Sequence, residues 1–258
     1  MAAAQRPIEW VSLLLARFEL QLPYYISGEA SHVGADLERN RECLIKLSRN
    51  LFSSVINGLA RLLKNLSLKP LTSGENEKSL YQSQLIILDT LEKCLAAQPK
   101  DTTRSDETML VKTLLPQLCL LLNYDSCDHL LISQLKTSAA RVLYALSLNN
   151  FNAVFSRISA CLESLTKTSD EACDESDIEL IQHINVNLER LIKLLNETIP
   201  KFFMLKKNSM STLAVSLEKA IWNWMDNYPD ELVKLEQNGN VEIKIGSGLQ
   251  EWWKRILV

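Results

Sequence analysis

Hydrophobic side chains recur at helical spacing along the segment from Leu80 to Leu122. Spacings of three and four residues place such side chains on one face of an α-helix. We predict two helices here, the first ending before Pro99 and the second beginning at Ser105, a good N-cap residue. Pro116 is expected to kink or divide the second helix. Two long helices joined by a short polar turn form an αα-hairpin, the unit from which helical solenoids are built. The apolar stripes are Tyr81, Leu85, Leu88, Leu91 and Leu95 in the first helix, and Met109, Leu110, Leu114, Leu118 and Leu121 in the second.

Three further helices are predicted before this hairpin. The opening helix has Pro7 in its first turn, where proline is tolerated, and is expected to end before Pro23. A polar loop that contains glycine follows from Tyr24 to Gly34, and a polar linker from Leu71 to Lys78 precedes the hairpin. The apolar positions are Ile8, Val11, Leu14, Leu15 and Phe18 in the first helix; Leu37, Cys43, Leu44 and Leu47 in the second, which begins near Asp36; and Leu51, Val55, Leu59, Leu62 and Leu66 in the third.

The chain after the hairpin also predicts helices. A helix or helix pair from Asp128 to Leu148 is followed by another helix and by an acidic loop. Ser176 and Glu179 form a capping box at the start of a long helix that Pro200 closes. The apolar positions are Leu131, Leu135, Ala139, Val142 and Leu146; then Phe151, Val154, Phe155, Ile158, Cys161, Leu162 and Leu165; then Ile178, Ile181, Ile184, Leu188, Leu191 and Leu195; and finally Leu213, Leu217, Ala220, Ile221 and Trp224, before a short segment that begins at Pro229.

These stripes predict an all-α protein of roughly nine to eleven helices, without an alternating pattern that indicates a strand. Helices begin near Lys78, Asp128 and Asp177, about fifty residues apart, which is somewhat longer than the ~40–47 residues of HEAT or armadillo repeats. We therefore predict an irregular HEAT/armadillo-like α-solenoid. A compact orthogonal helical bundle is the alternative.

Composition excludes several classes of function. The 258 residues carry a formal net charge of −3, which gives no overall attraction to nucleic acid or to an anionic membrane. The sequence has only seven glycines, and none lies between Glu75 and Asn238. Glycine-rich phosphate loops, dinucleotide-binding fingerprints and nucleophile elbows need backbone positions that glycine fills most easily. In their usual form, these motifs are therefore absent from that span.

The cysteines and the apolar segments bear on the cellular compartment. No two of the six cysteines have the spacing C-x-x-C, and such a set is typical of reduced, buried thiols in an intracellular protein. We therefore expect a cytoplasmic location. The apolar run from Val11 to Ala16 is too short for a signal peptide. No segment approaches the ~20 apolar residues of a spanning helix, so we predict no direct membrane insertion.

Candidate catalytic and metal-binding residues are few. Cys119, Cys127 and His129 are three potential ligands, but a structural zinc site needs four and no fourth lies nearby in the sequence. His183 lies between two isoleucines of a predicted helix, away from any recognisable nucleophile. The acidic residues of segment 170–175 lie in a predicted exposed loop, where nothing favours acid catalysis. We therefore expect no catalytic residue, no metal and no cofactor.

Two tryptophans are the candidate interface residues. Trp222 and Trp224 are two positions apart on a predicted helix, so they point to different sides of it. We expect one to fill the core and the other to contact a partner or the next repeat. Segment Lys201–Lys207 mixes aromatic and basic residues. Contact with lipid or nucleic acid is one interpretation of this segment, but apolar positions at helical spacing usually belong to a core.

Several sequence blocks match one known family in order and spacing. They are PIEWVSLLLARFELQLP, ECLIKLSRNLFSSVINGLARLLKN, LYQSQLIILDTLEKCLAAQPKDT followed by DETMLVK, NNFNAVFSRIS, DIELIQHINV and SLEKAIWNWMDNYPDE. From about Arg6 to Lys234, the chain resembles the N-terminal region of the neurofibromin family of Ras GTPase-activating proteins. The departures fall in predicted loops, where surface connections vary most. These loops are Tyr24–Asp36, Tyr124–Gln134 and Leu165–Glu175.

The resemblance implies an indirect role in Ras signalling. Proteins of this family stimulate GTP hydrolysis by Ras through a central domain, carry a lipid-binding module and dimerise through long HEAT-like regions. The matching region contains neither module, and neither Arg104 nor Arg157 matches the motif of the catalytic arginine finger. The chain is thus expected to be a non-enzymatic scaffold segment of a negative regulator of Ras. Its expected partners are the remainder of the parent chain and its dimer partner, not nucleic acid.

Two alternatives follow from the same sequence. One is a free-standing helical-repeat adaptor, or a short isoform that competes for the parent's partner. The other is an enzyme in its own right. The resemblance stops after Leu235, so residues 1–236 are predicted to form the helical-repeat region. Residues 237–258 are expected to be a divergent, disordered tail or the product of a truncated gene prediction.

Overall fold

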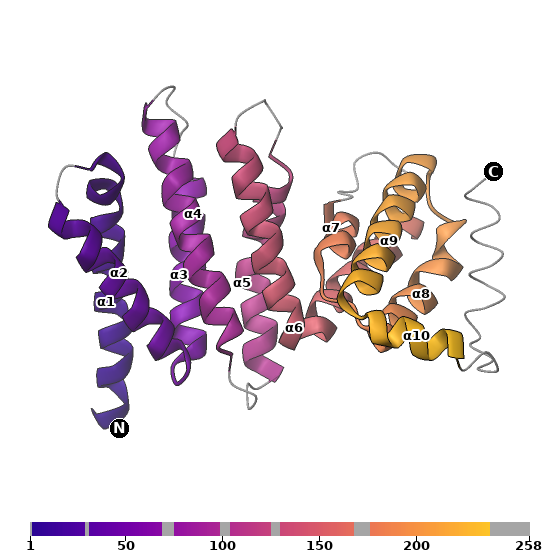
Figure 1. Cartoon of the computed structure of the whole chain (residues 1–258), viewed down its shortest axis with the longest axis horizontal. Coiled ribbons are helices and arrows are strands. Elements are labelled where there is room, and N and C mark those ends of the chain that lie inside the picture. The colour runs from indigo at the N-terminus through magenta and orange to yellow at the C-terminus, as the bar shows by residue number, and fades with distance from the viewer. Residues whose placement is uncertain are drawn as a thin grey trace. The chain divides into compact units, whose positions relative to one another are not determined.

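The computed structural model describes residues 2–28, 31–68, 75–98, 104–124, 130–167 and 176–237 (Figure 1). Within these ranges it contains ten α-helices that pack against each other, one short 3-10 helix and no strand, which confirms the all-α prediction. The elements are α1 (Ala2–Ser27), α2 (Ser31–Ser48), α3 (Phe52–Ser67), α4 (Glu75–Ala96), α5 (Arg104–Leu122), α6 (Leu130–Lys167), α7 (Ser176–Glu179), η1 (Leu180–His183), α8 (Leu188–Phe202), α9 (Lys207–Asn227) and α10 (Pro229–Gln237).

The chain divides into two compact units, Met1–Ala153 and Val154–Val258. The first unit holds α1 to α5 and the beginning of α6, and the second holds the end of α6 and the elements from α7 to α10. Of the predicted divergent tail, only Gln237, the last residue of α10, is among the described residues.

Each helix from α1 to α4 contacts several others in the first unit. α1 packs against α2, α3 and α4, and α2 packs against α3 and α4. α3 also packs against α4 and α5. Two ion pairs join α4 to other helices: the guanidinium of Arg41 on α2 donates to Asp89 on α4, and Arg141 on α6 donates to Glu92 on α4 at 2.9 Å.

Helix α3 is the centre of this unit, because it contacts α1, α2, α4 and α5. A helix covered on several sides must be apolar around most of its circumference, and α3 meets this requirement. The predicted pair α4 and α5 is antiparallel, since the ring of Tyr81 near the start of α4 lies 6.3 Å from that of Tyr124, just after α5. The buried residues of α3 are Phe52, Val55, Ile56, Gly58, Leu59, Ala60, Leu62, Leu63 and Leu66.

α1 and α3 approach each other closely at Gly58. A Cβ atom added there would overlap Cδ1 of Leu15, which is itself buried. At Gly34 on α2, an added Cβ would lie 3.5 Å from the ring of Tyr25, an ordinary van der Waals distance. The two helical glycines therefore differ in whether a methyl group has room.

This difference predicts opposite effects of the same substitution. Gly58→Ala should lower the free energy of unfolding by about 1–2 kcal/mol through overpacking, although alanine favours a helix by about 1 kcal/mol over glycine. Gly34→Ala should raise it by up to about 1 kcal/mol, because only the propensity changes. Urea unfolding of both variants measures the two shifts, and a stabilised Gly58→Ala variant would contradict the close approach.

In the second unit, α9 is the central helix and contacts α7, η1, α8 and α10. Its buried face includes Leu213, Leu217 and Trp224. Opposite it, the buried residues of the neighbouring elements include Ile178, Ile181, Leu191, Leu194 and Leu195. The predicted stripes of the last two apolar segments thus form the core of this unit.

The prolines end fewer helices than predicted. α1 continues through Pro23, α5 through Pro116, and α8 includes Pro200. A proline removes one backbone donor, which leaves the carbonyl four residues earlier without its helical partner. Water can donate to that carbonyl where the helix face is exposed. The residues four positions earlier are Glu19, Lys112 and Asn196, and all three are exposed. The predicted loop from Tyr24 to Gly34 is consequently helical in most of its described residues.

The predicted long helix that begins at Ser176 is divided instead. It forms α7, η1 and then an extended stretch before α8. Asn187 caps α8, since its side-chain oxygen accepts from the backbone N–H of Arg190 at 3.0 Å. Asn185 Nδ2 donates to the hydroxyl of Tyr228 at 3.0 Å. The side chain of Asn187 bonds to the local backbone, and that of Asn185 bonds to Tyr228, just before α10. Side-chain hydrogen bonds of this kind compete with a continuous helix.

The two helices predicted from Asp128 to Leu148 and from there to Leu165 lie within α6, on either side of a kink at Asn150. The backbone of Asn150 is non-helical, with φ −121° and ψ 28°. Asn150 is buried, and its Nδ2 donates to the carbonyl of Leu146 at 2.8 Å and to Oε1 of Gln98 at 2.9 Å. The side chain thus holds a kink in α6 against the end of α4.

Candidate functional site

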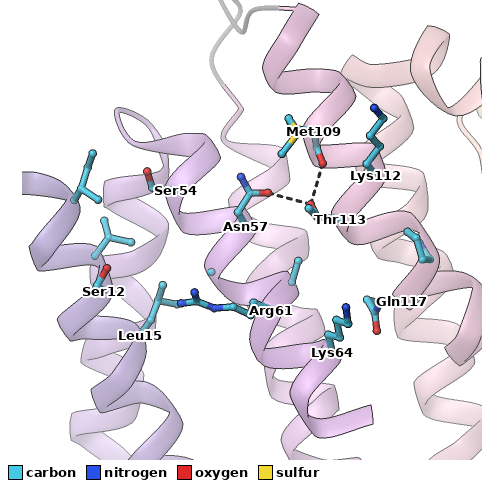
Figure 2. Close-up of a pocket in the computed structure, with 15 residues that line it drawn as sticks. Ser12, Leu15, Ser54, Asn57, Arg61, Lys64, Met109, Lys112, Thr113 and Gln117 are labelled. Carbon is cyan, nitrogen blue, oxygen red and sulfur yellow. Dashed lines mark hydrogen bonds between the residues drawn. The ribbon is translucent and has the colours of Figure 1, made fainter. Parts of the chain in front are cut away.

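A groove with a volume of about 660 Å³ runs across α1, α3 and α5 of the first unit (Figure 2). Leu15 on α1, Gly58 on α3 and Pro116 on α5 are among its lining residues, together with Ile8 and Met109, which are about half exposed. Met109 was predicted to belong to the core stripe of α5, and its exposure of 51% corrects that prediction. It lies in the first turns of α5, at a position that neighbouring helices do not cover.

A hydrogen bond between side chains links two of the helices that line the groove, α3 and α5. The hydroxyl of Thr113 on α5 lies 3.0 Å from Oδ1 of Asn57 on α3 and 3.0 Å from the carbonyl oxygen of Met109 (Figure 2). Asn57 thus accepts from a side chain of the neighbouring helix, and this contact links α3 to α5 beside the groove.

Three cationic side chains line this groove. They are Arg61 and Lys64 on α3 and Lys112 on α5. All three are exposed, and none has an ion-pair partner among the residues that the structure describes. No acidic residue lines the groove in the described part of the chain. Figure 2 shows Arg61 extending from α3 towards Leu15 on α1.

α1 also carries exposed apolar side chains on another face. Trp10, Leu13, Leu20 and Tyr24 are all more than half exposed, and Leu20 reaches 71%. At 100° per residue they lie on the side of α1 roughly opposite its buried positions Val11, Leu15, Phe18 and Leu22. We call Trp10, Leu13, Leu20 and Tyr24 the α1 stripe. Arg17, which is also exposed, lies between Leu13 and Leu20 on this face. Exposed large apolar residues gathered on one face are typical of a surface that another molecule covers.

The two predicted interface tryptophans differ in their surroundings. Trp224 is buried, at 6% exposure, and its indole N–H donates to Oε2 of Glu231 at 2.8 Å. The same oxygen accepts from the backbone N–H of Leu188 at the start of α8, at 2.9 Å. Trp222 is 53% exposed. Trp224 is therefore a core residue, and an interface role for Trp222 stays a prediction.

The structure also shows the surroundings of Arg157 and of segment 201–207, which the sequence analysis discussed as candidate sites. Arg157 donates from Nε to both carboxylate oxygens of Asp177, at 2.9 and 3.0 Å, and so ties α6 to α7 within the second unit. In segment 201–207, Phe202 and Leu205 are buried, as expected, but Phe203 and Met204 are exposed because α8 ends at Phe202. The side chain of Arg104 lies outside the described residues.

Of the three potential metal ligands, the structure describes only Cys119. Cys119 is buried, whereas Cys127, His129 and the acidic segment 170–175 lie outside the described residues. Among the described residues, no group of three or more His, Cys, Asp or Glu side chains could hold a metal ion. In the same residues, no helix is both long enough and apolar enough to span a membrane.

The thiol of Cys94 is fully buried in α4. Burial raises its pKa to about 11, against smaller lowering effects from a hydrogen bond with Ser48 and the charge of Arg41. A thiol with such a pKa stays protonated at neutral pH, and thiolate is the reactive form. Cys94 is accordingly a packing residue rather than a nucleophile.

His183 makes the stability of the second unit depend on pH. Partial burial, with the nearby charge of Lys219, lowers its pKa from 6.5 to about 4. Between pH 4 and 6.5 the imidazole is neutral in the folded state but takes up a proton when the chain unfolds. The free energy of unfolding is therefore highest above pH 6.5 and falls as the pH drops towards 4. We expect a loss of about 1–2 kcal/mol, since partial exposure reduces the cost of the charge. Urea unfolding between pH 7 and about 4.5 tests this, and His183→Gln should flatten the dependence.

Sequence reasoning missed the groove. Arg61 and Lys64 share a helix face, which their spacing of three residues could have shown. Lys112 and Met109 join them only through the packing of α3 against α5. A scan against models of known protein families finds no family that matches the chain.

Proposed function

We propose that the chain is a helical scaffold segment that serves protein–protein assembly, within a neurofibromin-like regulator of Ras signalling. The identity rests on the sequence blocks between Arg6 and Lys234. The assembly role rests chiefly on one structural observation, the α1 stripe. Tryptophan and tyrosine are enriched in protein interfaces, because each buries a large apolar area and retains a polar tip.

The arrangement of the first unit supports an α-solenoid of the HEAT or armadillo type. In such a solenoid, successive helix pairs stack so that alternate helices form two layers. The contacts of α1 with α3, α3 with α5, and α2 with α4 have this alternation. The ion pair from Arg41 to Asp89 joins α2 to α4, and the pair from Arg141 to Glu92 joins α4 to α6, so both connect alternate helices.

In this proposal the chain does not itself stimulate GTP hydrolysis. The arginine finger of a GTPase-activating protein must reach the phosphates of a bound nucleotide. Arg157 is engaged by the Asp177 carboxylate instead. The proposed activity therefore resides elsewhere in the parent protein, and this segment supplies a binding surface.

The test is a charge substitution in the α1 stripe. The double variant Leu13→Asp/Leu20→Asp should abolish assembly of the chain with a purified neurofibromin-like protein that lacks this segment, as measured by sedimentation velocity. The positions are exposed, so the thermal stability of the variant should be nearly unchanged.

The matched control is Ser133→Asp/Gln134→Asp, which adds the same charges at exposed positions on α6. It should assemble like the wild type. Equal assembly of the stripe variant and the wild type would contradict the proposed surface. Stimulation of Ras GTP hydrolysis by the chain alone would contradict the scaffold assignment.

A further inference from the structure

We propose that the groove across α1, α3 and α5 binds an acidic amphipathic helix of a partner protein. This inference deepens the proposed scaffold function and rests on it. The groove joins two properties that such a helix matches, apolar lining residues and three cationic side chains. Its volume of about 660 Å³ is in the range of sites that enclose the anchoring side chains of a ligand.

The cations have the spacing of a helix recognition site. Arg61 and Lys64 are three residues apart on α3, about one helical turn. Figure 2 shows α3 between α1 and α5, with Arg61 extending towards Leu15 on α1 and Lys64 lying nearer to Gln117 on α5. A partner helix with Asp or Glu three or four residues apart can pair with both. Lys112 comes from the neighbouring helix α5 (Figure 2). It can pair with an acidic residue on the other flank of the same helix.

The charge of these side chains is available for a partner. Elsewhere in the first unit, the guanidinium groups of Arg41 and Arg141 are paired with carboxylates. The three groove cations have no such partner among the described residues, and their positive field is not cancelled by an acidic lining residue. Complementary charge steers association and fixes the register of the partner.

The apolar positions select a helix over a nucleic acid. Ile8 and Met109 are about half exposed, and Leu15 and Pro116 also line the groove. These side chains suit Leu, Ile or Met anchors on a helix laid into the groove. Single-stranded nucleic acids need aromatic side chains for base stacking, and no aromatic residue lines this groove in the described part of the chain.

A selection experiment tests the proposal without a known partner. The probe is a phage-displayed library of helical peptides about 15 residues long, randomised on one face and selected on the complete chain. We expect the selected peptides to carry Asp or Glu at spacings of three or four residues beside apolar anchors. Binding of the best synthetic peptide should weaken about tenfold or more in Arg61→Glu/Lys64→Glu. It should also weaken as NaCl rises from about 0.05 to 0.5 M.

The control variant is Arg49→Glu/Lys78→Glu, which reverses two exposed charges of the same unit outside the groove. It should bind the peptide like the wild type, and circular dichroism should show that both double variants are folded. Met109→Ser tests the apolar part separately and should also weaken binding. Selected peptides without acidic enrichment, or peptide binding unaffected by Arg61→Glu/Lys64→Glu, would overturn the proposal. Groove-dependent binding of single-stranded RNA in place of the peptide would overturn it as well.

The failure of this inference is separable from that of the scaffold function. The α1 stripe lies on another face of α1, so Leu13→Asp/Leu20→Asp should leave peptide binding unchanged. Loss of groove binding with intact assembly through the stripe removes only the acidic-helix proposal. Loss of assembly through the stripe removes the scaffold proposal.

Discussion

Replacement of Trp224 by alanine is expected to lower the free energy of unfolding of the second unit by about 3–5 kcal/mol. The side chain is buried between α9 and its neighbours, so truncation leaves a large cavity. It also removes the indole donor of Glu231, whose Oε2 holds the first N–H of α8. Amide hydrogen exchange should accelerate in α8, α9 and α10. Urea unfolding measures the magnitude.

Trp222→Ala is the matched control, with the same change two residues away on the same helix. Because Trp222 is exposed, its removal should change the free energy of unfolding by no more than about 0.5 kcal/mol. Similar losses in both variants would mean that Trp224 does not hold the core position described above. If Trp222→Ala also leaves assembly intact, the predicted interface role of Trp222 should be abandoned.

Leu63→Ala is expected to have a comparable effect in the first unit, about 3–5 kcal/mol. Leu63 is fully buried on α3, the helix that contacts four others, so the surrounding structure has little freedom to collapse into the cavity. Hydrogen exchange should accelerate in α1 to α5. Leu20→Ala removes the same atoms from an exposed position and should cost less than about 0.5 kcal/mol. A small effect at Leu63 would contradict the central position of α3.

The helices themselves could be predicted because their apolar stripes coincide with the faces that pack. Leu88, Leu91 and Leu95 lie at helical spacing and are fully buried in α4. The same holds for Leu213 and Leu217 in α9. Burial of one apolar stripe stabilises a helix more than local propensity does. Hydrophobic periodicity was therefore sufficient to predict these helices.

Backbone exceptions were harder to predict because local and tertiary effects compete there. The rule that proline ends a helix failed at Pro23, where an exposed helix face tolerates the missing donor. The stripe through Ile184 suggested one helix, but the amide groups of Asn185 and Asn187 bond elsewhere and divide it. The bond of Asn185 involves Tyr228, which is distant in sequence, so periodicity alone does not reveal it.

Surfaces were the least predictable part. The spacing of Trp222 and Trp224 showed that they face apart, but not which one is buried. That depends on Glu231 and on the packing of α10. The groove needs three helices that are separated by intervening elements. Its cations belong to no continuous motif, so only the packed helices bring them together.

The buried thiol of Cys94 provides a native probe of local opening in this chain. Thiolate is the form that attacks alkylating reagents, and a pKa of about 11 together with complete burial suppresses this reaction at Cys94 in the folded state. The partly accessible Cys43 and Cys161 should be modified first. The rate of Cys94 modification would then report the rate at which α4 separates from its neighbours. Mass spectrometry could measure this local opening without any engineered label.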